Sequence, residues 1–349
     1  MKKYKYILLT LLSSLCVSCI QPFDLKLDDD PAIFLEAFPG VEDVVVFKIL
    51  PAYSYSNSAV KPELNPEIIF MVNGERVPVV LNKDYCMGEE YDQTCYIADY
   101  KPMPGDRMSV EVSSEGFPTI YAETSIPDVF PERKIDFQVI STGKEKYGIV
   151  SVSFEDDEET DLSYGLQIYN ETVRTYPDTV AVFYDEYAGS QIIEEYDIYV
   201  PGLDGMCISF NGWSVNSSYY DIAAWNDDSF NGKEKTLSMP VDRYYYGEDY
   251  TEDSFYVHEE EREIWGEDGP TGEYYTELQR NKLVMYTMSH EFHKYVIANE
   301  LKYANTEVFA GIAPSNFCYS NVENGYGAFA GIYRVESEWI TKEFIEENR

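Results

Sequence analysis

Short apolar runs separated by turn residues dominate the first third of the chain. The run 68–72 (IIFMV) leads into Asn73-Gly74 and then into the run 76–81. Asn-Gly between two apolar runs is the strongest short-range signal for a β-hairpin, because both residues tolerate positive φ. Regularly spaced strands with no helical pattern predict an immunoglobulin-like β-sandwich over residues 31–127. The other strands predicted there cover residues 32–38, 44–50, 96–98, 108–112 and 120–124.

A short segment flanked by prolines marks the predicted domain boundary. Pro127 and Pro131 bracket an extended linker, and the apolar runs beyond it predict a larger β-rich domain over residues 132–349. Its predicted strands cover residues 135–140, 148–154, 163–169, 179–183, 206–210, 236–241, 282–288 and 328–334. The expected fold class is therefore mostly β.

One helix is predicted near the C-terminus. Ser289 has the character of an N-cap for a helix that reaches about Tyr303. Phe292, Tyr295 and Val296 share one face at helical spacing, and further apolar residues lie on the other side. A helix that is apolar on two sides needs cover on both, so we expect it to be wedged against the sheet or between the domains.

Two long stretches rich in tyrosine and acidic residues interrupt the second domain, at residues 184–199 and 244–275. Loops of this length in a compact domain are often functional. Aromatic and acidic side chains together suit a sugar, a peptide or a cation, and the alternative is a surface insertion without a binding role. The candidate ligand or partner residues are Tyr244, Tyr245, Tyr246 and Trp265.

The N-terminal residues have the pattern of an exported lipoprotein. Lysines at the start precede an apolar run of about 12 residues, too short for the ~20 that a spanning helix needs. Ser18 and Cys19 follow, so residues 1–18 are predicted to be a signal peptide and Cys19 the lipid-attachment residue. Residues 19–30 then form an extended tether, and acyl chains on Cys19 would anchor the protein. The alternative is the cleaved signal of a soluble protein.

Composition limits the function further. The 349 residues carry a formal net charge of −37, which repels nucleic acid and anionic lipid surfaces, so a nucleic-acid partner is not expected. The 32 tyrosines combine strand preference with a polar tip suited to half-wet surfaces. The acidic run 155–161 is expected to be a solvated loop.

Four cysteines remain after the predicted processing, and an oxidising compartment permits disulfides between them. Cys86 and Cys95 bracket a polar stretch, which suits a disulfide across a loop. Cys207 and Cys318 are a second candidate pair, if the fold brings them together. Spacing alone leaves the connectivity open.

No constellation of catalytic or metal-binding residues stands out. His290 and His293 lie three apart on the predicted helix, and Asp227 with its neighbours offers oxygen ligands, but neither matches a known zinc or EF-hand spacing. With three histidines in the chain, a serine or cysteine triad is improbable. No cofactor, metal or enzymatic activity is therefore expected, although a pair of glycosidase carboxylates among so many acidic residues stays open.

The second half of the chain carries a family likeness. Residues 314–331 (PSNFCYSNVENGYGAFAG) resemble the closing motif of a Bacteroidetes outer-membrane lipoprotein family of unknown function. The preceding helix with Tyr295 and Tyr303, the turn at residues 227–233 and the Thr124–Pro127 linker are similar to features of that family. Within the closing motif, Asn and Gly residues predict tight turn geometry.

The resemblance implies a role in nutrient capture, because such lipoproteins are often encoded beside TonB-dependent transporters and SusD-like lipoproteins. It implies no catalytic residues. We therefore expect a surface-exposed outer-membrane lipoprotein that serves as a non-catalytic accessory or ligand-binding component of TonB-dependent uptake. The alternatives are a surface hydrolase with paired carboxylates and an adhesin or structural surface module.

Overall fold

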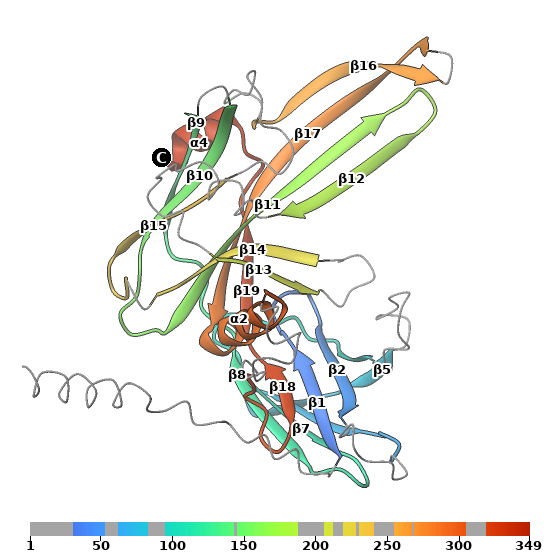
Figure 1. The fold of residues 1–349 in the computed structure, drawn as a ribbon, viewed down its shortest axis with the longest axis vertical. Coiled ribbons are helices and arrows are strands. Elements are labelled where there is room, and N and C mark those ends of the chain that lie inside the picture. The colour runs from blue at the N-terminus through green and yellow to red at the C-terminus, as the bar shows by residue number, and fades with distance from the viewer. Residues whose placement is uncertain are drawn as a thin grey trace, which may run out of the picture.

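The computed structural model describes residues 31–52, 62–82, 95–142, 145–187, 206–211, 219–227, 230–240, 255–266, 269–304 and 319–349. These residues are mostly β with two helices, so the predicted fold class is confirmed. The predicted helix near the C-terminus is α2 (His290–Ala304), and a shorter helix, α4 (Lys342–Asn348), follows it (Figure 1). No helix within these ranges is long and apolar enough to span a membrane.

The N-terminal part is a sandwich of two sheets. Its sheets have the strand orders β18-β1-β2-β6-β5 and β4-β3-β7-β8. The strands are β1 (Ala32–Ala37), β2 (Val45–Ala52), β3 (Glu67–Val72), β4 (Glu75–Val77), β5 (Val80–Asn82), β6 (Cys95–Ala98), β7 (Arg107–Ser113), β8 (Ile120–Ser125) and β18 (Tyr326–Phe329).

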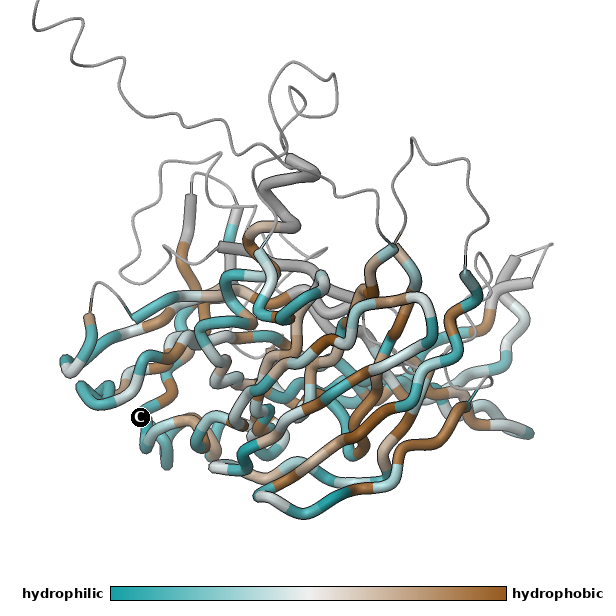
Figure 2. Tube along the Cα trace, turned by 90° about the horizontal axis from the view of Figure 1, so that it is seen from below, coloured by the Kyte–Doolittle hydropathy of each residue, from teal (hydrophilic) through white to brown (hydrophobic). Residues whose placement is uncertain are grey.

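Both sheets bury alternate side chains in one shared core. In β7 the buried residues are Met108, Val110 and Val112, which confirms the predicted alternation. Phe47 of one sheet meets Phe70 of the other, with ring centres 5.1 Å apart. Hydrophobic and hydrophilic residues alternate along many of the strands in Figure 2. The structure thus shows two sheets around one core; the immunoglobulin-like arrangement stays a prediction.

The predicted hairpin at Asn73-Gly74 is confirmed. It joins β3 to β4, and both turn residues have positive φ, 52° and 84°. Asn73 also donates a side-chain hydrogen bond of 2.8 Å to Asp106, which fixes the turn to the segment before β7. The turn chemistry therefore sets the register of the two strands.

The strand β18 lies far along the chain yet completes the N-terminal sheet by pairing in parallel with β1. Gly327 permits this approach, because a Cβ there would lie 1.9 Å from the carbonyl oxygen of Leu35. The predicted division into residues 31–127 and 132–349 therefore does not describe residues 326–329, which belong to the N-terminal sandwich.

The closing motif has the turn geometry that its sequence predicts. Asn324 has a φ of 59°, and the side chain of Asn321 accepts a hydrogen bond from Phe329 N (3.0 Å) and donates one to Phe329 O (2.8 Å). The single strand predicted at residues 328–334 is wrong, because the chain leaves the sheet at Gly331. There the Gly331 N–H donates to the hydroxyl of Thr124 (2.8 Å), and β19 (Ile332–Glu336) begins in another sheet.

The C-terminal part is built on two further sheets. A three-stranded sheet has the order β15-β10-β9, and a seven-stranded sheet has the order β13-β14-β11-β17-β16, with β12 beside β11 and β19 beside β17. The strands are β9 (Arg133–Thr142), β10 (Glu145–Glu155), β11 (Leu162–Thr175), β12 (Val180–Tyr187), β13 (Met206–Asn211), β14 (Tyr219–Asn226), β15 (Glu234–Pro240), β16 (His258–Gly266) and β17 (Gly269–Ser289).

A second core fills the space between these two sheets. Val150 and Val152 of β10 face Leu166 of β11 and Leu283 and Met285 of β17, and all five are fully buried. A third core joins the two parts of the molecule and contains α2. Its members from the N-terminal sandwich and the segments around it include Phe38, Ala328 and Ala330.

The helix α2 is wedged between the two parts, as its two-sided apolar pattern predicts. Phe292 packs edge-on against Phe38, with ring centres 5.0 Å apart, and the Tyr295 hydroxyl donates to Glu36 of β1 (3.2 Å). The hydroxyl of Ser289 accepts from Phe292 N (3.3 Å), so the predicted N-cap is confirmed.

Two predictions about loops are wrong. Residues 184–187 belong to β12, and residues 258–266 and 269–275 belong to β16 and β17, so neither acidic stretch is a loop throughout. Strands exposed on both faces carry no apolar alternation, and this hid them in the sequence. For the same reason β11 and β17 extend well beyond the predicted strands 163–169 and 282–288.

Candidate functional site

The outer halves of β11 and β17 extend beyond the body of the molecule (Figure 1). There β12 pairs with β11 and β16 pairs with β17, which gives the local strand order β12-β11-β17-β16. We call these four outer segments, residues 170–187, 258–266 and 269–280, the arm. Since side chains alternate between the faces of a sheet, the register divides the arm into two faces of different chemistry.

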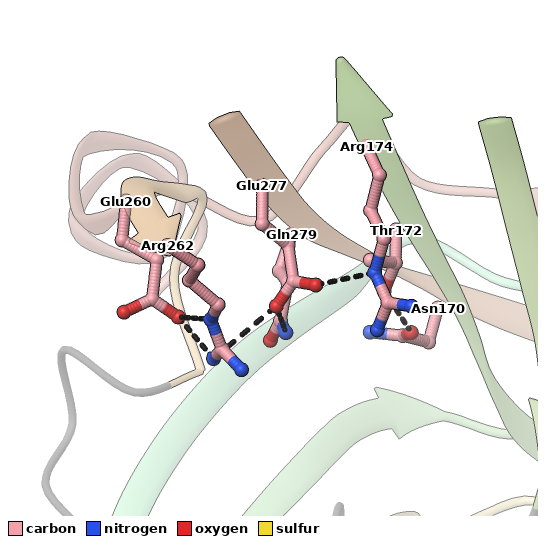
Figure 3. Close-up of polar contacts among 7 residues, drawn as sticks. All are labelled: Asn170, Thr172, Arg174, Glu260, Arg262, Glu277 and Gln279. Atoms are coloured by element: carbon pink, nitrogen blue, oxygen red, sulfur yellow. Dashed lines mark hydrogen bonds and ion pairs between the residues drawn. The ribbon is translucent and has the colours of Figure 1, made fainter. Parts of the chain in front are cut away.

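One face carries a polar network that crosses three strands (Figure 3). Glu277 at its centre is 1% exposed and accepts from Arg174 Nε (2.6 Å) and from Gln279 Nε2 (2.9 Å). Arg262 of β16 lies 3.2 Å from the second carboxylate oxygen and is held in turn by Glu260. The network therefore ties β16, β17 and β11 together.

Charge decides the ionisation of this buried carboxylate. Burial alone would raise the pKa of Glu277, but the hydrogen bonds from Arg174 and Gln279 and the charges of both arginines lower it below its usual value. Glu277 is thus ionised at neutral pH, and the two arginines balance it.

Aromatic rings extend this network to the arm's outer edge and tip. The guanidinium carbon of Arg174 lies 4.9 Å from the ring centre of Phe183 and 5.8 Å from that of Tyr275. Tyr275 stacks on Tyr176 in the hairpin turn, with ring centres 5.0 Å apart. Such contacts are worth about 0.5–1.5 kcal/mol each and stiffen a sheet that has no apolar core of its own here.

The opposite face of the arm is apolar and exposed along its β12 edge, whereas its β16 edge carries the exposed charges of Glu259 and Glu261. Val180, Val182 and Tyr184 of β12 are 59%, 50% and 59% exposed, and Tyr274 of β17 is 49% exposed. Large apolar side chains gathered on one surface of a strongly acidic protein indicate a binding surface for another macromolecule.

An open pocket of about 640 Å³ lies where the C-terminal segment crosses the seven-stranded sheet. Trp339 there covers two cations, with Arg280 4.0 Å and Lys282 4.5 Å from its ring centre. Both cations are already paired, Arg280 with Glu171 and Lys282 with Glu336. The lining residues are Lys282, Ser337, Glu338, Trp339, Thr341, Glu343, Phe344 and Glu347.

Most of the residues to which the sequence analysis gives a role lie, wholly or with their side chains, outside the part of the chain that the structure describes. The residues outside the described ranges are Cys19, Cys86, Cys318, Tyr244, Tyr245 and Tyr246. Cys207 lies in β13 and Trp265 in β16, but their side chains are outside the described part. Cys95 is buried at the start of β6 and is disulfide-bonded, and its pairing with Cys86 stays a prediction.

The candidate metal ligands have other contacts. His290 Nδ1 lies 3.3 Å from Asp161, and the carboxylate of Asp227 accepts from Leu162 N (2.9 Å). The backbone carbonyl of Asp227 accepts from Phe230 N and Asn231 N, which makes the predicted turn. Within the described ranges, no group of three or more histidine, cysteine or acidic side chains is arranged to hold a metal ion.

Sequence reasoning missed the residues that build the arm. Arg174, Arg262 and Glu277 gave no signal, because only the pairing register of three strands brings them together. The apolar run from Val180 to Tyr184 was visible, but it ran into a stretch interpreted as a loop.

No protein-family model matches the chain, and no curated protein matches it.

Proposed function

We propose that this protein is a surface-exposed outer-membrane lipoprotein, anchored through Cys19, that serves as a non-catalytic accessory or ligand-binding component of TonB-dependent nutrient uptake. The observation that carries the proposal is the exposed apolar edge strand of the arm, β12, with Val180, Val182 and Tyr184 each at least half exposed. A surface of this kind favours a binding role, because exposed apolar area suits contact with another macromolecule.

The proposed mechanism follows from the anchor and the arm. Acyl chains on Cys19 would confine the protein to the membrane plane, and the tether of residues 19–30 would raise its effective concentration beside a transporter. The arm reaches away from the body and would make the contact. The expected partners are a TonB-dependent transporter and its SusD-like lipoprotein, with no nucleic acid.

Affinity capture of the intact lipoprotein from outer membranes in mild detergent tests this function. A transporter and its SusD-like partner, recovered in stoichiometric amounts, are the expected result. A Cys19→Ser variant should be lost from the membrane fraction while its body stays folded. Recovery of the lipoprotein alone would contradict the proposal.

A surface hydrolase is the second candidate, and one observation favours it. The carboxylates of Glu338, Glu343 and Glu347 line the open pocket beside Trp339. Most glycoside hydrolases use a pair of carboxylates that flank the scissile bond. Hydrolysis of a glycan panel that disappears in both Glu338→Gln and Glu343→Gln would favour this function; an inactive wild-type protein excludes it for that panel.

A further inference from the structure

The two edges of the arm differ in chemistry. The edge strand β16 carries the exposed residues Glu259, Glu260, Glu261 and Arg262. Charged side chains on an edge strand prevent another strand from adding to it. The edge strand β12 has no such protection along its centre, where the sequence runs from Val180 to Tyr184 without a charge.

The hydrogen-bond pattern fixes which backbone groups of β12 face outward. Tyr176 N donates to Thr179 O (2.8 Å) in the turn between β11 and β12. Because antiparallel pairs alternate between bonded and non-bonded, the N–H and C=O groups of Val180, Val182 and Tyr184 point away from β11. Within the described residues, β12 pairs with β11 alone.

The outward backbone groups therefore belong to the three residues whose exposed apolar side chains share one face of β12, while Phe183, 49% exposed, lies on the other face. Strand addition uses main-chain hydrogen bonds for affinity and alternate side chains for specificity, and β12 presents both. On its inner side β12 is braced, since Phe183 packs against Arg174 and Arg174 binds Glu277. These contacts hold β12 against the rest of the arm.

We propose that β12 takes up an extended segment of a partner protein as an added strand. The inference rests on the proposed function only in that the partner is a protein. The partner's apolar side chains would cover Val180, Val182 and Tyr184. Its ends would carry lysine or arginine, because Asp178 precedes β12 and Asp185-Glu186 lie toward its end in a chain of net charge −37.

The same charges argue against a second copy of this chain as the occupant. An antiparallel pairing of two β12 strands centred on Val182 would place Asp178 of one copy opposite Glu186 of the other. Like charges directly opposite destabilise a pair, and two molecules of net charge −37 repel each other. A basic, apolar strand from another protein meets neither penalty.

A set of defined peptides tests the proposal. The probe is a labelled peptide of alternating valine and threonine with lysine at both ends, matched to the 8 residues of β12. The controls are the same peptide with glutamate ends and the same peptide N-methylated on alternate amides, which removes one edge of hydrogen-bond donors. Fluorescence anisotropy with the intact chain measures binding.

We expect the lysine-ended peptide to bind, and each control peptide to bind at least about tenfold more weakly. Val182→Pro should weaken binding by a similar factor, because it removes an outward N–H and leaves the inward ones intact. The matched control, Glu261→Ala on the opposite edge, should bind within about twofold of wild type.

Equal binding of the methylated and unmethylated peptides would overturn strand addition, as would the absence of binding by the lysine-ended peptide. A dimer seen by light scattering that Val182→Pro disperses would replace the partner with a second copy. Affinity capture from membranes separates this inference from the proposed function. If wild type and Val182→Pro recover the transporter equally, only the inference is overturned. If neither protein recovers a transporter, the proposed function is overturned.

Discussion

The two halves of β17 show how one strand is stabilised in two ways. In the body, Leu283, Val284, Met285 and Tyr286 are all fully buried, and packing on both faces of the sheet fixes the strand. In the arm, Glu277 is the only buried side chain between residues 271 and 280. Because ion pairs and stacked rings hold the arm together, its apolar side chains do not have to form a core, and those of β12 stay exposed.

A matched pair of leucine truncations should give the largest difference between the two halves. Leu283→Ala in the body removes a fully buried side chain and should cost ~2–5 kcal/mol of unfolding free energy. Leu278→Ala, in the same strand but half-buried in the arm, should cost less than about 1 kcal/mol. Urea denaturation measures both, and equal losses would show that the arm is part of the folding core.

Removing the charge at the centre of the arm should loosen the arm alone. Glu277→Ala leaves Arg174 and Arg262 without their shared partner, and the arm should lose about 1–3 kcal/mol of local stability. Hydrogen exchange should quicken in β11, β16 and β17 beyond the body and stay unchanged in the second core. Glu261→Ala, an exposed residue of β16, is the control.

The direction of the pKa shift of Glu277 determines how its contribution to the stability of the arm depends on pH. The pKa of Glu277 is lower in the folded protein than in the unfolded chain. The ionised carboxylate therefore stabilises the arm fully at a pH above the pKa of the unfolded chain, and this stabilisation is lost as the pH falls through the pKa of the folded protein. Exchange in the arm should therefore quicken selectively in acid. A Glu277→Ala variant whose arm shows the same acid dependence would contradict this assignment.

A glutamate in the N-terminal sandwich should behave in the opposite way. Glu36 lies between Lys48 on β2 and the Tyr295 hydroxyl. Burial raises its pKa, and these partners offset the effect only in part. The contribution of Glu36 to the free energy of unfolding is thus complete at a pH below the pKa of the unfolded chain. It is lost as the pH rises through the pKa of the folded protein.

Glu36→Gln should accordingly raise the unfolding free energy near neutral pH, by about 1 kcal/mol or less, and should flatten its decline with pH. Tyr295→Phe is the companion variant, because it removes the hydroxyl that favours the ionised form. Urea denaturation at several pH values measures both. A loss of stability at neutral pH in Glu36→Gln would show that the attraction to the charge of Lys48 outweighs burial.

Edge variants of β12 should have the smallest effect on stability. Val182→Thr changes an exposed side chain on an edge strand and should shift the unfolding free energy by no more than about 0.5 kcal/mol. The same substitution should weaken binding of the lysine-ended peptide. A large loss of unfolding free energy with unchanged peptide binding would show that Val182 stabilises the fold and does not contact the peptide.

Local chemistry allowed several features to be predicted from the sequence. The hairpin at Asn73-Gly74, the cap at Ser289 and the turn at Asn324 each depend on a few neighbouring residues, and all three are confirmed. Apolar alternation likewise located strands that bury one face, such as β7.

Features that depend on distant residues could not be predicted in this way. The parallel pairing of β18 with β1 joins segments almost 300 residues apart, and Gly327 gives no sign of which strand it will approach. The arm escaped notice because its strands are exposed on both faces. Its network needs Arg174, Glu277 and Arg262 in register across three strands, and single-sequence patterns contain no register.

Hydrogen exchange at successive residues of β12 tests the central claim most directly. In the free protein, the amides of Ala181 and Phe183 should exchange slowly, and those of Val180, Val182 and Tyr184 should exchange fast. Adding the lysine-ended peptide should slow the second set by at least about tenfold and leave the first set unchanged. Uniform protection, or no change at Val182 and Tyr184 while the peptide is bound, would contradict the account.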